Sequence, residues 1–402
     1  MEPSPRTASP STEASSRLVS LDALRGFDMF WIVGGAGILR ALEKFTGSPI
    51  LGGLRMQLTH VDWEGFRFYD LIFPLFVFIA GVSLVFSTRK AVERGGKAAA
   101  VKRLLGRGLL LFLVGVFYSG GISDGLDGIR WLGVLNRIAI ASTAAGILAV
   151  FLPVRALAAT TVAILLGYWG LMSQVPFPAF RLDKGAVAEA MARSGETNLV
   201  RLYQATTERV SGRYEPGYNL ANHIDFQYLP GRRYDTYYDP EGILSNLPAV
   251  ATCLLGTLAG SVLAAAGGAR RTLHLAGAGI VCIVLGHLWS PAFPIVKKLW
   301  SSSFVLVAGG YSLLLLAAFH EIVDIRGWRT WCRPFLWIGT NAITIYLLAS
   351  VMGYSRIAGR FLSPNLRTSM GAWGEVALAA GSLLVMFLFA RALYRRNLFL
   401  RL

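Results

Sequence analysis

Ten apolar blocks separated by polar connections run along the chain after residue 17. They lie near residues 21–42, 69–87, 104–119, 132–152, 156–173, 244–266, 272–289, 303–322, 334–354 and 374–393. About 20 apolar residues are enough for a helix to cross a bilayer. Shorter blocks are also accepted, because flanking Lys and Arg reach the interface and the bilayer thins. The pattern predicts an all-α integral membrane bundle of about ten transmembrane helices, surrounded by lipid.

Composition supports this interpretation. Of the 402 residues, 54% are hydrophobic and only 15% are charged, and the mean hydropathy is +0.52. A soluble domain carries roughly 25% charged residues. The net charge is +16, but the basic residues cluster between apolar blocks, which favours a membrane surface over nucleic acid as their partner.

The short connections predict the orientation. Residues 88–107 contain seven Lys or Arg beside two spans, which is typical of the cytoplasmic side. By parity, three further basic groups fall on the same side: Arg270 and Arg271; Arg326, Arg329 and Arg333; Arg395, Arg396 and Arg401. Both termini are therefore expected to be cytoplasmic.

Two polar stretches interrupt the pattern. Residues 1–17 are rich in Ser, Pro and Thr and are expected to form a disordered cytoplasmic tail, which leaves 18–402 as one transmembrane domain. Residues 174–243 form a long loop on the extracytoplasmic side. Loops of this length are usually functional or disordered. Its aromatic-rich part, 214–239, is predicted to be ordered and to pack over the mouth of the site.

Charged residues inside apolar blocks are costly and need an explanation. In the first block, Asp22 and Arg25 are three residues apart and share a helix face. One interpretation is an intrahelical pair at the cytoplasmic interface. The other is an anion site, because the guanidinium fork of Arg suits phosphate.

The segment around the second block contains the strongest catalytic candidates. His60 precedes this block on the extracytoplasmic side, and Asp70 begins it. A histidine can act as a general base near neutral pH, and a carboxylate can fix its tautomer. A lone histidine in a loop is more often simply solvated, so the residues alone support catalysis by His60 only weakly.

Later blocks carry further polar candidates. Arg137 is flanked by apolar residues, and a buried pair with Asp124 or Asp127 is its ordinary explanation. Asn341 lies inside the ninth block, where interhelical hydrogen bonding is the simpler interpretation. Asp239 and Glu241 directly precede the sixth block, where acidic residues near Pro240 are typical of a helix start.

The sequence lacks the common cofactor-binding motifs. The chain contains no phosphate-binding Gly loop, dinucleotide fingerprint, zinc-protease helix or CxxC pair. Its three cysteines show no metal-ligand spacing. The sequence therefore predicts neither a metal nor a redox cofactor.

Six segments, taken in order, resemble the bacterial relatives of heparan-α-glucosaminide N-acetyltransferase, within a wider superfamily of transmembrane acyltransferases. They are SLDALRGFDMF at 20–30, HVDWEGFRFYDLIFPLFVFIAGVSL at 60–84, LGVLNRIAIA at 132–141, YYDPEGILSNLPA at 237–249, KKLWSSSFVL at 297–306 and GTNAITIY at 339–346. The resemblance covers nearly all of the chain after the tail.

This resemblance implies a transmembrane acetyltransferase. Acetyl-CoA would serve as co-substrate from the cytosol, and an amino sugar or envelope glycan on the extracytoplasmic side would accept the acetyl group. The family's active-site histidine and aspartate fall on His60 and Asp70. His60 would act as general base or acetyl carrier, and Asp70 would orient it. Asp22, Arg25, Arg137, Asp239, Glu241 and Asn341 remain weaker candidates for binding acetyl-CoA or the acceptor.

Two other functions remain open. A transporter of amino sugars or oligosaccharides would also carry intramembrane charges and Pro-interrupted spans. An O-acyltransferase would acylate a lipid or polysaccharide hydroxyl instead of an amine. The expected location is the bacterial inner membrane. The oligomeric state stays open, with a homodimer among the alternatives.

Overall fold

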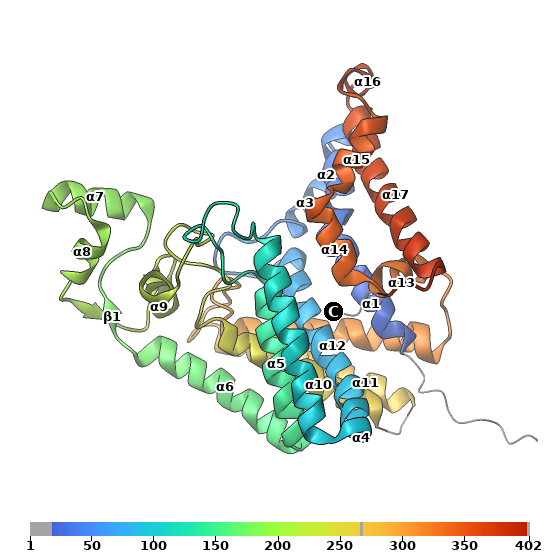
Figure 1. The fold of residues 1–402 in the computed structure, drawn as a ribbon, viewed down its shortest axis with the longest axis horizontal. Coiled ribbons are helices and arrows are strands. Elements are labelled where there is room, and N and C mark those ends of the chain that lie inside the picture. The colour runs from blue at the N-terminus through green and yellow to red at the C-terminus, as the bar shows by residue number, and fades with distance from the viewer. Residues whose placement is uncertain (1–17, 266–267, 400–402) are drawn as a thin grey trace, which may run out of the picture.

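The computed structural model describes residues 18–265 and 268–399, and the predicted tail at 1–17 lies outside them. These residues form a bundle of helices with two short two-stranded antiparallel sheets (Figure 1). The first half contains α1 (Val19–Phe30), the π-helix η1 (Trp31–Gly35), α2 (Ala36–Thr46), α3 (Pro49–Gln57), α4 (Phe68–Tyr118), α5 (Val134–Phe151) and α6 (Val154–Gln174). The second half contains α10 (Asn246–Ala264), α11 (Ala269–Trp289), α12 (Ser302–Phe319), the π-helix η2 (His320–Ile325), α13 (Arg333–Gly339), α14 (Ala342–Val351), α15 (Tyr354–Phe361), α16 (Pro364–Ser369) and α17 (Trp373–Arg395).

The predicted all-α membrane architecture is confirmed. Seven of the described helices are long and apolar enough to cross a bilayer, and the count becomes eight if α13 and α14, which meet at 75°, form one broken span. Two details separate this count from the predicted ten. The first block is divided between α1, η1 and α2, and the second and third blocks are both contained in α4.

The helix α4 turns back on itself at Gly96. A straight helix of its 51 residues would be about 77 Å long, more than twice the thickness of a hydrocarbon core. Gly96 breaks it with φ 75° and ψ 178°, a conformation that glycine adopts without steric cost. The turn lies at the same end of the bundle as the α5–α6 connection (Figure 1). Because residues 88–107 surround it, we call this end the basic end.

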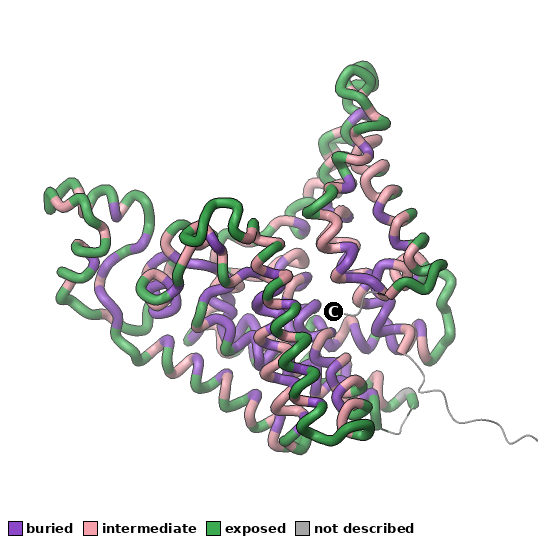
Figure 2. The backbone as a smooth tube through the Cα atoms, viewed as in Figure 1, coloured by how far each residue is buried: buried purple, intermediate pink, exposed green. Residues whose placement is uncertain are grey.

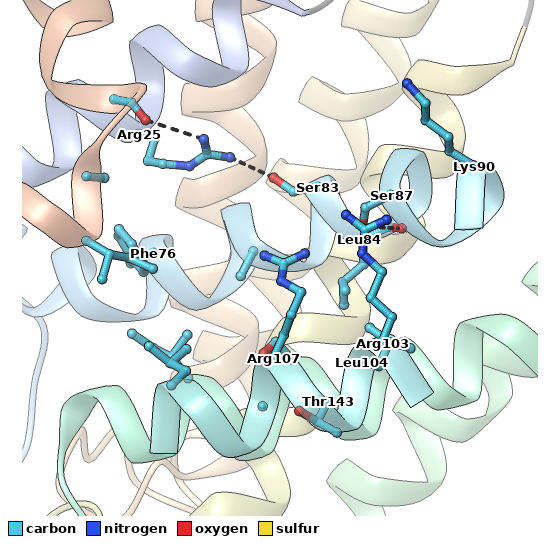
Figure 3. Close-up of a pocket in the computed structure, with 18 of the residues that line it drawn as sticks. Arg25, Phe76, Ser83, Leu84, Ser87, Lys90, Arg103, Leu104, Arg107 and Thr143 are labelled. Carbon is cyan, nitrogen blue, oxygen red and sulfur yellow. Dashed lines mark hydrogen bonds between the residues drawn. The ribbon is translucent and has the colours of Figure 1, made fainter. Parts of the chain in front are cut away.

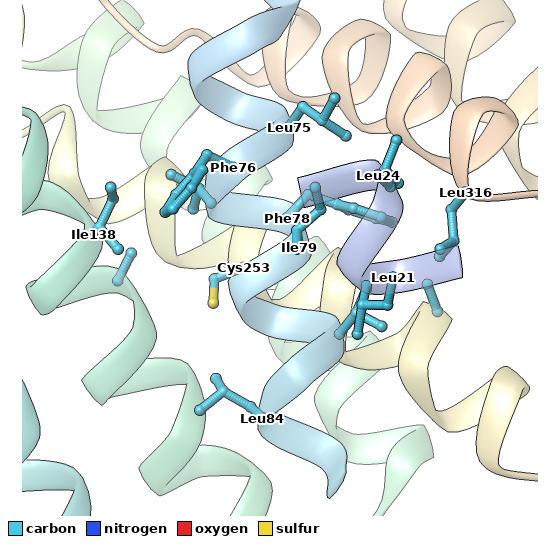
Figure 4. Packing of buried hydrophobic residues seen from close by; sticks show 14 of the residues in the cluster. Leu21, Leu24, Leu75, Phe76, Phe78, Ile79, Leu84, Ile138, Cys253 and Leu316 are labelled. Atoms are coloured by element: carbon cyan, nitrogen blue, oxygen red, sulfur yellow. The ribbon is translucent and has the colours of Figure 1, made fainter. Parts of the chain in front are cut away.

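Close packing against α4 places the first half of this helix at the centre. A Cβ at Gly81 would lie 1.9 Å from the carbonyl oxygen of Cys253, and one at Gly256 would lie 1.9 Å from that of Phe78. The backbones of α4 and α10 therefore touch, because small residues at Gly81 and Gly256 allow the close approach. Leu24 and Leu316 complete the buried core around α4 (Figures 2 and 4).

The opposite end of the bundle carries the long loop. Its short strands pair as β1 (Phe177–Pro178) with β2 (Arg209–Val210), and as β3 (Tyr214–Glu215) with β4 (Tyr218–Asn219). The loop also contains α7 (Lys184–Ser194), α8 (Leu199–Gln204) and α9 (Leu220–Tyr228), and α7 and α8 stand away from the bundle (Figure 1). Trp63 donates its indole N–H to the carbonyl of Tyr214 at 2.8 Å. The loop is thereby joined to the segment that carries His60.

Candidate active site

His60, Asp70 and Lys297 meet at the opposite end. The Nδ1 atom of His60 lies 2.8 Å from Oδ1 of Asp70, and the Lys297 ammonium lies 3.0 Å from the same Nδ1 and 3.4 Å from the same Oδ1. The carboxylate of Asp70 is fully buried, whereas the His60 side chain is 52% exposed. Nδ1 of His60 faces the buried carboxylate, and Nε2, which lies 3.5 Å from the Lys297 ammonium, is the ring nitrogen turned away from that carboxylate.

Hydrogen bonds hold both oxygens of the Asp70 carboxylate. Oδ2 accepts hydrogen bonds from the backbone N–H groups of Val61 at 3.3 Å and Arg67 at 3.2 Å, and the latter caps the first turn of α4. Arg67 also donates to the carbonyl of His60 at 3.2 Å. The loop carrying His60 is therefore folded back onto the first turn of α4, which explains how residues ten apart come into contact.

Lys297 comes from a distant part of the chain. It lies in the segment 290–301 between α11 and α12, which meets the His60 loop where Gly65 N–H donates to the carbonyl of Ile295 at 2.9 Å. Glu64 and Val296 form an antiparallel bridge at the same place. The sequence analysis does not assign Lys297 to the site. Its place in the resembling segment KKLWSSSFVL was the one available signal.

A basic pocket opens between the two halves of α4 near the basic end. It has a volume of about 450 Å³ and contains five cationic side chains: Arg25, Lys90, Arg94, Arg103 and Arg107. Figure 3 shows the side chains of Arg25, Arg103 and Arg107 reaching into this space. Arg25 donates to Asp22 at 3.1 Å and to Ser83 at 2.7 Å, so the intrahelical pair is present, and the anion site stays a prediction. Five cations around a hollow suit a polyanionic group.

A narrow apolar cavity continues from the basic pocket. The two cavities share Phe76, Ile138 and Ile343, and the second also touches Phe73 and Tyr346. Phe76 and Phe73 share one face of α4 with Tyr69, whose ring centre lies 4.7 Å from that of His60. This face of α4 therefore runs from the basic pocket to His60, and Ser87 lies 17 residues after Asp70, or about 26 Å along the helix.

A second group of charges lies between the apolar cavity and the long loop. Arg130 donates to both oxygens of Asp239, at 2.8 and 2.7 Å, and to Glu241 at 2.7 Å. The interpretation of these acids as a helix start is therefore wrong, because α10 begins later, at Asn246, and the carboxylates bind Arg130 instead. The sequence alone does not indicate this role for Arg130, because its partners are more than 100 residues away along the chain.

Arg137 belongs to the same region. It is 1% exposed and donates to the carbonyl of Pro240 at 2.8 Å and to the hydroxyl of Ser245, while its guanidinium lies 4.6 Å from the ring centre of Trp300. The expected partnership with Asp124 or Asp127 is therefore wrong. The acidic groups that act on Arg137 come from the segment that precedes α10 and from α9.

Burial and neighbouring charges shift the pKa values of three charged groups outside the spans. Burial raises the pKa of Glu241, and Asp239 adds to this effect against the opposing charges of Arg137 and Arg130. Burial lowers the pKa of Lys297, although the charges of Asp70 and Glu241 oppose it. Burial also disfavours the charged form of Arg130, but its bonds to Asp239 and Glu241 outweigh burial and raise its pKa.

Asn341 lies away from His60, at the bend between α13 and α14. It is 2% exposed, and its neighbours Thr340 and Ala342 line the basic pocket. The structure therefore places the candidates in three groups: His60 and Asp70 with Lys297; Arg137, Asp239 and Glu241 with Arg130; and Asp22, Arg25 and Asn341 in or beside the basic pocket.

The fold and its apolar helices define an integral membrane protein with a histidine–aspartate site at one end. Residues 17–185, which include both of these side chains, match the family model described as heparan-α-glucosaminide N-acetyltransferase, catalytic. The resemblance to this family that the sequence motifs indicate is therefore confirmed.

Two curated relatives agree with this match. The heparan-α-glucosaminide N-acetyltransferase of Mus musculus is 26% identical over 358 residues, which cover 78% of this chain and 53% of that protein. The protein of the same name from Homo sapiens is 25% identical over 357 residues, or 77% of this chain and 52% of that protein. The chain thus spans about half the length of these relatives.

Proposed function

We propose that this protein is a transmembrane N-acetyltransferase that moves acetyl from cytosolic acetyl-CoA to an amino sugar or amino-bearing envelope glycan across a bacterial cytoplasmic membrane. The observation that carries the proposal is the face of α4 that joins a five-cation pocket at one end to His60 and Asp70 at the other. An acyl donor with a polyanionic head and a thin thioester arm matches this arrangement.

The membrane explains why the head of the acyl donor would stay at one end of the protein while its acetyl group reaches the other. Moving the charges of CoA through hydrocarbon is prohibitively costly. In the proposed geometry the phosphates stay in the basic pocket, and only the arm enters the apolar cavity toward His60. The cavity is narrow, so the arm would displace the side chains that line it, such as Phe73 and Phe76.

The chemistry requires a base at the far end. An acceptor R–NH3⁺ loses one proton to Nε2 of His60, and the free amine attacks the thioester carbonyl. The new C–N bond forms, the C–S bond breaks, and the thiolate takes the proton from His60, so one further proton is released as the amide forms. In an alternative order, Nε2 itself accepts the acetyl group before the amine does. Asp70 keeps Nδ1 protonated and Nε2 available in either order.

Oriented proteoliposomes test the function. Labelled acetyl-CoA on the face that carries residues 88–107 is expected to acetylate glucosamine supplied only on the other face. Labelled acetyl retained on the protein without acceptor would establish the second order of events. A transporter would move glucosamine without acetylating it, and an O-acyltransferase would accept a hydroxyl acceptor equally well. Either result contradicts the proposal.

The basic pocket gives a separate prediction. We expect Arg103→Gln to weaken CoA binding by about 5- to 10-fold, because one partly solvated charge-assisted contact to phosphate is removed. Calorimetry with CoA and with pantetheine measures the effect. Pantetheine, which has no phosphate, should bind both proteins equally. Arg395→Gln, which removes an exposed charge outside the pocket, is the matched control. Equal losses for CoA and pantetheine would place the phosphates elsewhere.

A further inference from the structure

Lys297 contacts both His60 and Asp70, and the proposed function gives it no role. Its ammonium lies between the base and the carboxylate, 3.0 Å from Nδ1 of His60 and 3.4 Å from Oδ1 of Asp70. Its side chain is 18% exposed. A lysine packed this closely places a positive charge beside both His60 and Asp70.

The geometry makes Lys297 and His60 competitors for one oxygen. Oδ2 of Asp70 is already occupied by two backbone N–H groups, so only Oδ1 remains for either side chain. When Nδ1 of His60 carries a proton, it donates to Oδ1. When it does not, its lone pair can accept from Lys297, and the ring proton then sits on Nε2, where it would block attack on the substrate.

The backbone holds Lys297 in this position. Val296 N–H donates to the hydroxyl of Ser301 at 3.1 Å, and that hydroxyl donates to the carbonyl of Pro294 at 2.7 Å. Three residues after Lys297, Trp300 is fully buried with φ 52°, a conformation that bulky residues rarely adopt. Backbone strain of this kind persists where the surroundings enforce it, and it is concentrated at functional sites.

We propose that Lys297 is a positioning residue, which shares Oδ1 of Asp70 with His60 and places a positive charge against the imidazole ring. The ammonium disfavours a second positive charge on the adjacent imidazole and thereby opposes the effect of Asp70. This inference rests on the proposed function.

Other charged or titratable groups also lie near His60 and Asp70. Tyr69 lies beside the His60 ring, Arg67 donates to the carbonyl of His60, and the charge of Arg40 reaches Tyr69. The charges of Glu241 and Arg137 also act on the Lys297 ammonium. Of these groups, Lys297 and Asp70 are the charges in direct contact with the ring, so the largest change is expected from removing one of them.

Lys297→Met and Lys297→Gln test the inference together. In both variants the acid limb of the kcat/KM profile should move up by about one pH unit, because the ring protonates more readily without its cationic neighbour. Lys297→Arg, which keeps the charge, should stay within a fraction of a unit of the parent. Lys298→Met is the matched control, because it removes the same charge one residue away, where the partner is Asp235 at 2.9 Å.

A readout without turnover separates this inference from the proposed function. The ring ¹³C shifts of labelled histidine follow the protonation of His60 directly, and a His60→Ala spectrum assigns its signal among the five histidines. The titration should move up by about one unit in the Met and Gln variants. An unmoved titration overturns the role of Lys297 whether or not the protein transfers acetyl. A moved titration in a protein that fails to acetylate any amine would overturn the proposed function alone.

Discussion

His60→Ala is expected to lower acetyl transfer by about 10²- to 10⁴-fold, the usual contribution of a positioned acid–base group. Acetyl-CoA binding should remain near normal, because Arg25 reaches α4 at Ser83, about 20 Å along the helix from Asp70, and the other cations of the basic pocket lie beyond it. Steady-state transfer to glucosamine and calorimetric CoA binding measure the two quantities separately. Near-normal turnover in this variant would remove His60 from the mechanism.

Two substitutions in the same segment sharpen this test. Asp70→Asn should cause a large but incomplete loss, because an amide at this position can donate to Nδ1 and favour the tautomer whose Nε2 carries the proton. Asp62→Asn changes an exposed acid two residues after His60 and should leave transfer unchanged. Equal losses for both variants would indicate a general effect of acidic residues here, rather than a specific partner for His60.

Arg130→Met is expected to cost about 3–5 kcal/mol of stability, because it leaves two carboxylates without their cation. Asp239 is fully buried and Glu241 is 12% exposed at the side chain. Thermal unfolding of the detergent-solubilised protein measures the loss. Adding Asp239→Asn to the same chain should recover part of it, since one uncompensated charge is then removed.

An exposed ion pair provides the control for this prediction. Arg193 and Glu189 pair one turn apart on α7, with side chains that are 73% and 63% exposed. Arg193→Met should therefore change stability by less than about 1 kcal/mol. If the two arginine variants unfold at the same temperature, the Arg130 network does not hold the long loop to the bundle.

The sequence was most informative where the signal is local. Apolar blocks follow directly from the cost of placing polar groups in lipid, so the helices could be predicted without any contact information. His60 and Asp70 are ten residues apart and are brought together by one loop. Their roles, however, came from resemblance, because a histidine in a loop has no distinguishing physical signature.

Contacts between distant segments could not be predicted in the same way. Lys297 lies in a short connection without periodicity, and nothing in its neighbourhood indicates a partner near residue 60. Arg137 was assigned to nearby acids, yet its contacts come from the segment after residue 239. The bend at Asn341 was also missed, since α13 and α14 together form one continuous apolar block in the sequence.

The distance along the chain between the parts of the site has a consequence for biosynthesis. Lys297 and His60 are separated by 237 residues. At about 5–20 residues per second, a ribosome would complete the second group roughly 10–50 s after the first. During that interval the growing protein would already carry the imidazole and its carboxylate, but not the ammonium that completes the site. Full activity is therefore expected to begin only once the sixth and seventh apolar blocks have been inserted and the segment after α11 has closed onto the first loop.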